Sequence, residues 1–183
     1  MKQQMERLVL AARELGATNA AVIDVNKLVF SREFRHLCEL NSCGRYGTNW
    51  TCPPGVGTLE ELEGKIKKYD TGLLIQVVRQ LEDSFDFEGM MKAKSDLEEV
   101  LEKVSIKIKK DFGYKDLFLL KAGACSICKE CTYAIGEKCR FPEKAFPSVE
   151  ACGIDVKELT TNCGIPYYNG KDTVSYVGVI LFK

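Results

Sequence analysis

Hydrophobic positions recur with helical spacing in four segments of the chain. The first pattern covers residues 5–15 and stops at Gly16, and the longest covers residues 87–112 and stops at Gly113. Two shorter helices are predicted after Thr58 and Asp155, because each of these residues is followed three positions later by a Glu and so begins a capping box. The pattern therefore predicts four helices, one of them much longer than the others.

Short apolar runs between these helices predict strands. They cover residues 20–25, 72–79, 117–121 and 173–182, and a turn at Asn26 and Lys27 leads into a further segment at 28–31. Because helices and strands alternate, we predict an α/β or α+β fold. It forms a single layered domain over residues 1–183, with helices packed on a sheet of about four or five strands and with two cysteine-rich metal-binding loops.

The balance of basic and acidic side chains argues against some classes of binding partner. The chain has 26 basic and 26 acidic side chains and a formal net charge of zero, whereas proteins that bind nucleic acids or anionic membranes usually carry a basic excess. No apolar run approaches the ~20 residues of a membrane-spanning helix, and the first residues lack the apolar core of a secretory signal. We therefore expect a cytoplasmic protein with no nucleic-acid or membrane partner. In that reducing compartment, clustered thiols are typical of metal ligands or redox groups.

The strongest chemical signal is a group of four cysteines in a loop after the third strand. Cys125, Cys128 and Cys131 are separated by two residues each, which is the spacing of ferredoxin-type iron–sulfur ligands. Cys139 follows after seven further residues, so the match to that motif is partial. A zinc site usually takes two ligands from each of two distant segments, and the middle cysteine fits a single tetrahedral ion poorly. We predict a [4Fe–4S] cluster here, with zinc and free or redox-active thiols as alternatives.

A second group lies in a Gly-rich irregular segment that contains Cys38, Cys43 and Cys52. It offers three ligands and no obvious fourth, and small buried thiols are the alternative interpretation. Cys152 is our preferred fourth ligand for this group and Cys163 is the rival. Which cysteine joins which cluster is left open by the sequence.

Other residues of the first segment allow two interpretations. Arg45, Tyr46 and Trp50 would either line a substrate pocket beside an open iron or shield a cluster from water, and shielding is the simpler role. The only histidine, His36, is more typical of a surface residue than of a ligand. No phosphate-binding loop, dinucleotide-binding motif, zinc-protease motif or hydrolase nucleophile motif occurs.

Two strings of residues resemble a known family. The stretch CGRYGTNWTCPP, together with the later CSICKEC and CRFPEKAFPSVEACGIDV, is similar to an uncharacterised family of predicted cysteine-rich metal-binding proteins of bacteria and archaea. The resemblance runs from about the first cysteine segment to the final strand. It implies metal binding, most simply by iron–sulfur clusters, in anaerobic or facultative organisms, and it implies no known reaction. The family's ligand pattern would fall on Cys43 and Cys52 and on the four cysteines of the later loop.

Taken together, these features predict a soluble iron–sulfur protein that binds two [4Fe–4S] clusters. It would act in electron transfer or as a redox accessory, with a redox partner protein or small molecule. One alternative is an enzyme in which a three-cysteine cluster keeps one iron open for sulfur transfer or Lewis-acid chemistry. Another is a zinc-stabilised binding module. The predicted ligands are Cys38, Cys43, Cys52, Cys125, Cys128, Cys131, Cys139 and Cys152.

Overall fold

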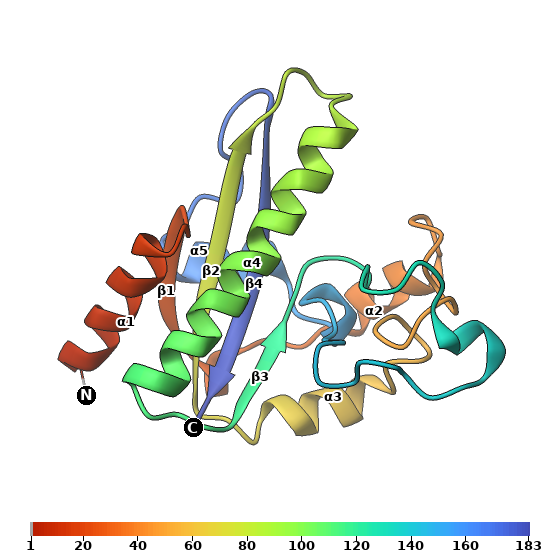
Figure 1. Cartoon of the computed structure of the whole chain (residues 1–183), viewed down its shortest axis with the longest axis horizontal. Helices are drawn as coiled ribbons and strands as arrows, with labels where there is room; N and C mark the ends of the chain where they lie inside the picture. Colours follow the sequence, from red (N-terminus) through yellow and green to blue (C-terminus); the bar gives the residue numbers. More distant parts are fainter. Residues whose placement is uncertain (1) are drawn as a thin grey trace.

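A four-stranded antiparallel sheet forms the centre of the molecule (Figure 1). The computed structural model describes residues 2–183. The strands are β1 (Asn19–Asp24), β2 (Thr71–Gln80), β3 (Leu117–Leu120) and β4 (Thr173–Phe182), in the spatial order β1-β2-β4-β3. Because every neighbouring pair is antiparallel, the fold is α+β, which decides between the two predicted classes. The predicted number of strands is confirmed at four.

The two central strands explain the longest apolar runs of the sequence. Strands β2 and β4 pair over their whole length, from Thr71 opposite Phe182 to Gln80 opposite Thr173. Helices cover both faces of the sheet (Figure 1). Residues 72–77 of β2 are therefore all buried, and buried positions do not alternate with exposed ones there. Gln76 interrupts this run, and its side chain accepts a hydrogen bond from Asn19 and donates one to the carbonyl of Pro166, both at 2.8 Å.

The four predicted helices are confirmed and divide between the two faces. Helices α1 (Lys2–Glu14) and α4 (Phe87–Asp111) pack on one face, and α3 (Leu59–Ile66) and α5 (Val156–Asn162) contribute to the core on the other. Thr58 forms the complete capping box with Glu61, and Asp155 accepts hydrogen bonds from the first turn of α5. Within residues 2–183, no helix is long and apolar enough to cross a membrane.

The sequence expectation is wrong in one segment before the first cysteines. Residues 32–39 form helix α2 (Arg32–Glu39), so Cys38 lies in a helix and not in an irregular segment. Helix α2 spans only eight residues and none of them is buried. Its apolar positions Phe34, Leu37 and Cys38 complete a single helical repeat, which is too short a pattern to predict a helix. Residues 28–31 form no strand beyond a single bridge between Phe30 and Ile154.

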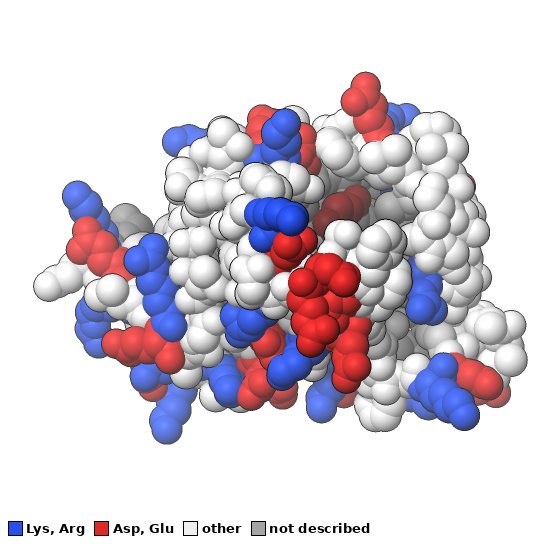
Figure 2. Space-filling view, turned by 90° about the horizontal axis from the view of Figure 1, so that it is seen from above, with Lys and Arg blue, Asp and Glu red and all other residues white. Residues whose placement is uncertain are grey.

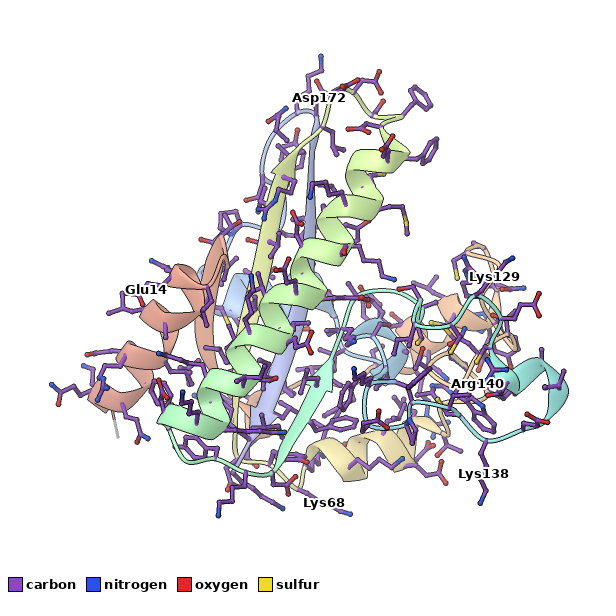
Figure 3. The ribbon with its side chains drawn as sticks, in the orientation of Figure 1. Glu14, Lys68, Lys129, Lys138, Arg140 and Asp172 are labelled. Atoms are coloured by element: carbon purple, nitrogen blue, oxygen red, sulfur yellow. The ribbon has the colours of Figure 1, made fainter. Side chains whose placement is uncertain are left out.

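The cysteine-rich segments lie together beside the edge strand β3. The first runs from α2 to α3, and the second follows β3 and includes the short 3-10 helices η2 (Thr132–Ile135) and η3 (Glu150–Cys152). Figure 3 shows sulfur atoms of both segments in this one part of the molecule, away from α1 and β1. The sheet and its helices therefore act as a scaffold that carries both cysteine groups at one side.

Candidate metal centre

All four cysteines of the later loop line a single cavity. The space that can admit a water molecule is about 20 Å³, and it belongs to a hollow that is partly open to solvent. Besides Cys125, Cys128, Cys131 and Cys139, its wall includes the apolar side chains of Ile127, Phe141 and Ala145 and residues from the first cysteine segment. Residues that the sequence groups by spacing are thus also grouped in space.

Local hydrogen bonds bring the two ends of this loop together. The 3-10 helix η2 begins directly after Cys131 and ends at Gly136, whose φ of 70° is a conformation that glycine adopts readily. The buried hydroxyl of Thr132 donates to the carbonyl of Lys138 at 3.0 Å. The Arg140 guanidinium donates to the carbonyl of Glu130 at 3.1 Å. The chain therefore returns on itself, which places Cys139 beside Cys131 despite the seven residues between them.

Two residues of the first cysteine segment complete the cavity wall. The indole N–H of Trp50 donates to the carbonyl of Glu137 at 3.1 Å, and its ring meets Tyr133 edge to face with centroids 4.9 Å apart. The hydroxyl of Thr51 accepts a hydrogen bond from the backbone N–H of Cys125 at 3.1 Å. Trp50 thus shields the cysteines of the other loop, a long-range contact that the sequence alone did not reveal.

The contact between the two segments is close and specific. Asn49 is buried, and its side-chain oxygen accepts hydrogen bonds from both the N–H and the hydroxyl of Thr51. A Cβ atom on Gly55 would lie 2.7 Å from both the Tyr133 ring and the carbonyl oxygen of Asn49. Glycine is therefore required at position 55 for the segments to approach each other as they do.

The electrostatics of Cys125 reflect its neighbours in the cavity. Burial raises the pKa of its thiol, and the backbone N–H of Ile127 and the nearby Lys121 oppose that rise. The thiols of Cys131 and Cys139 raise the pKa of Cys125 further, because a thiolate beside other thiolates is unfavourable. A bound cation would relieve this repulsion, so the donor set suits a positively charged metal centre. Lys129 and Lys138 lie on the outside of the same loop (Figure 3), and Arg140 lines the cavity itself.

The first cysteine group is also brought together, but in a more open setting. Burial raises the pKa of the Cys38 thiol most, with further increases from Cys52 and Cys43 and a decrease from Arg35. Burial likewise raises the pKa of Cys52, where Cys43 adds to the increase and a hydrogen bond from Asn49 opposes it. Cys43 itself is exposed. The three thiols are therefore near neighbours at the surface.

Arg35 connects this group to the rest of the fold. From the middle of α2, its guanidinium donates to the carbonyl of Ala151 at 3.0 Å and to that of Gly57 at 2.5 Å. These bonds join α2 to η3 and to the chain entering α3. The position of Cys38 thus depends on contacts with distant parts of the chain.

The two proposed fourth ligands, Cys152 and Cys163, pack in the core on the α3 and α5 side of the sheet. Cys152 is 0% exposed within the core between the sheet and helices α3 and α5. Burial raises the pKa of its thiol to about 12, and the charged groups that act on it are Arg35, Glu150 and Lys65, with no cysteine among them. Burial alone raises the pKa of the half-buried Cys163. Seven of the nine cysteines therefore fall in two groups. Cys152 is buried in the core, in the 3-10 helix η3 that Arg35 joins to α2, and Cys163 follows α5.

Metal binding by any of these thiols stays a prediction. Within residues 2–183, no three side chains of Cys, His, Asp or Glu converge closely enough to hold a single metal ion. The four later cysteines surround a space, and they do not point at one position. His36 lies at the surface, where its Nδ1 is 3.3 Å from the carboxylate oxygen Oε2 of Glu39.

A comparison with protein families gives a match over most of the chain. A family described as predicted metal-binding protein (DUF2284) matches residues 21–182, which include β1 from residue 21 onward, the other three strands and both cysteine groups. No curated protein and no solved structure matches the chain.

Proposed function

This chain belongs to the DUF2284 family of predicted metal-binding proteins, and we propose that it is an iron–sulfur protein. Its principal cluster would be a [4Fe–4S] centre held by Cys125, Cys128, Cys131 and Cys139. When bound, such a cluster supplies a one-electron redox couple. The proposed role is therefore electron transfer, or that of a redox accessory to another protein.

The observation that carries this proposal is the cavity that these four cysteines share. Around one zinc ion, with Zn–S bonds of about 2.3 Å, tetrahedral geometry would place the four sulfur atoms only about 3.8 Å apart. A cube with iron at four corners needs its ligands spread around a larger volume. Four thiols that line a space, and do not converge on a point, favour the cluster over the single ion.

The residues around the cavity suit a redox centre. Trp50, Ile127 and Phe141 contribute apolar surface to the wall. An apolar wall limits the access of water to a cluster and so tunes its potential and its stability in air. Because the cavity is still partly open, the centre would lie near enough to the surface to exchange electrons with a partner.

A second function is favoured by the first cysteine group. Cys38, Cys43 and Cys52 supply three thiols, and neither Cys152 nor Cys163 is among the groups that act on them. A cluster held by three cysteines keeps one iron without a protein ligand, which is the arrangement that catalytic metal sites use for substrate. Here Cys43 is exposed, so a small molecule could approach. Sulfur transfer and Lewis-acid chemistry are the reaction classes that fit.

Metal analysis of protein purified under argon tests the proposal. We expect a brown protein with broad absorbance near about 400 nm and matching amounts of iron and acid-labile sulfide. About four of each per chain would correspond to the later loop alone and about eight to both groups. A colourless protein that carries one or two zinc ions, and that unfolds when a chelator removes them, would show the zinc-stabilised module instead.

A further inference from the structure

The turn between β2 and α4 lies at one end of the molecule (Figure 1). It exposes large apolar side chains. Phe85 is 76% exposed and Phe87 is 69% exposed. Met91 lies one helical turn after Phe87 on α4 and is 59% exposed, so it shares a helix face with Phe87. We call these three residues the aromatic tip. Apolar side chains grouped in this way are typical of interaction sites.

Hydrogen bonds hold the backbone of the aromatic tip in place. The Asp83 carboxylate accepts from the N–H of Phe85 at 2.7 Å. The Asp86 carboxylate caps α4 by accepting from Gly89 at 2.8 Å, and it also accepts from Glu82 at 3.2 Å. The turn is therefore preorganised with both phenylalanines directed outward, which lowers the entropy that a docking event must overcome.

The aromatic tip lies in an acidic stretch of the chain. Residues 81–91 include four carboxylates and no Lys or Arg, and the adjoining turn before β4 adds Lys171 paired with Asp172. The next basic residue, Lys92, lies 3.5 Å from Asp96 further along the helix. Figure 2 looks onto this end of the molecule and shows acidic side chains gathered near the centre of the view. The excess of carboxylates over basic side chains in residues 81–91 repels anionic membranes and favours a partner surface that carries Lys and Arg.

Helix α4 connects the aromatic tip to the candidate metal centre. Lys94 lies seven residues after Phe87 on the same face, about 10 Å along the helix axis. Its ammonium group donates to the carbonyl of Ala124 at 2.8 Å, and Ala124 immediately precedes Cys125. A protein seated on the aromatic tip would therefore lie beside the loop of four cysteines.

We propose that the aromatic tip docks a partner protein whose surface has an apolar pocket ringed by Lys and Arg. Phe85 and Phe87 fill the pocket, as aromatic anchors do at the centres of protein interfaces. Glu82 and Glu88 pair with the basic ring and increase the rate of association. This inference goes beyond the proposed function and does not depend on which metal the cysteines bind.

Photo-crosslinking in cells of the source organism tests this proposal on the full chain. The photoreactive amino acid p-benzoylphenylalanine replaces Phe85 or Phe87, and the matched control replaces Ile106, which is 57% exposed on the same helix. We expect one host protein to be crosslinked from positions 85 and 87 and not from 106. The combined substitution Glu82→Lys and Glu88→Lys should reduce this adduct at least tenfold, while Asp83 and Asp86 remain to hold the turn.

The crosslinked protein is then identified, produced and mixed with this chain in purified form. We expect its binding to weaken as salt rises and to weaken at least tenfold for Phe85→Ala with Phe87→Ala, in variants whose circular dichroism matches the wild type. The proposal is overturned by equal crosslinking from position 106, by no adduct, or by an adduct that survives charge reversal. An adduct with a second copy of this chain, or sedimentation of the chain with anionic phospholipid vesicles in place of protein binding, also overturns it. Because crosslinking needs no bound metal, these outcomes are independent of the iron analysis.

Discussion

The two cysteine groups occupy the same length of chain, fifteen residues each, yet their surroundings differ. The later group has four thiols that line one cavity, and Trp50 and Thr51 from the other segment complete its wall. The earlier group has three thiols, of which two are half-buried and Cys43 is exposed. Equal spans of sequence therefore produce one group that lines a cavity and one more exposed group, and Trp50 of the first segment lies in the wall of the second.

This difference bears on how each site would form. In the later loop, gaps of two residues close small loops, which lose little chain entropy when the thiols are gathered. In the earlier group, Cys38 lies on α2, and α2 depends on Arg35 for its contacts with distant parts of the chain. We expect the later site to be the more robust one and the earlier site to depend on the whole fold.

The largest effect is expected from Cys128→Ala. Loss of one of four ligands should remove the later cluster, about four irons per chain, and lower the free energy of unfolding by several kcal/mol, because bound metal contributes directly to folding. Iron analysis and urea unfolding measure both quantities. Cys163→Ala is the matched control, since this thiol lies outside both groups, and it should keep all the iron. Full iron in Cys128→Ala would invert the ranking of the two sites.

Trp50→Ala should open the enclosed site without removing a ligand. It deletes the edge-to-face contact with Tyr133 and the hydrogen bond to Glu137, and we expect a loss of about 1–3 kcal/mol of stability for this half-buried ring. The absorbance of the cluster should bleach several-fold faster in air. Trp50→Phe keeps an aromatic ring at the cavity wall and should bleach at a rate close to that of the wild type. Equal bleaching of all three proteins would mean that Trp50 shields nothing.

Cys43→Ala should affect only the open site. The exposed thiol contributes little to packing, so the variant should remain folded and lose only the metal of the earlier group. With metal removed from both proteins, its stability should lie within about 1 kcal/mol of that of the wild type. Circular dichroism and iron counts, compared with those of Cys128→Ala, separate the two sites. If Cys43→Ala unfolds the chain, the earlier group is the structural one.

The smallest effect on metal is expected from Cys152→Ala. The Cys152 thiol is buried among apolar side chains with no cysteine acting on it, so the iron content should stay unchanged, while the small cavity should cost about 1–2 kcal/mol of stability. Iron lost in proportion to the earlier cluster would identify Cys152 as its fourth ligand, as the sequence suggested.

Cys152 should also leave a signature at high pH. Its pKa is raised to about 12 in the folded protein, against about 8.5 in an unfolded chain. The folded state therefore holds a proton that the unfolded state releases above about pH 9, and stability falls with rising pH by up to about 1.4 kcal/mol per unit from this group. In metal-free protein, Cys152→Ala should show a shallower fall between pH 9 and 10 than the wild type. Identical slopes would mean that Cys152 is not protonated in the core.

The sequence predicted the helices and strands that local hydrophobic patterns mark. It did not predict the features that depend on contacts between distant segments. The helices that bury an apolar stripe, such as α4, and the strands within apolar runs were predicted close to their observed bounds. Helix α2 was missed because its eight residues allow only one repeat of the apolar spacing. The contact of Trp50 with Tyr133 joins residues 83 positions apart, and no local spacing indicates which cysteine group an aromatic residue covers. The spacing of Cys125, Cys128 and Cys131 did indicate their grouping, because short gaps leave few other arrangements.

We propose that the later loop holds a complete cluster by itself. The most direct test combines Cys38→Ala, Cys43→Ala and Cys52→Ala in one chain and measures iron, acid-labile sulfide and absorbance under argon. We expect about four irons and four sulfides per chain, and the broad absorbance band at about 400 nm should be retained. A folded triple variant that binds no iron, or that binds a single zinc ion in its place, would contradict it.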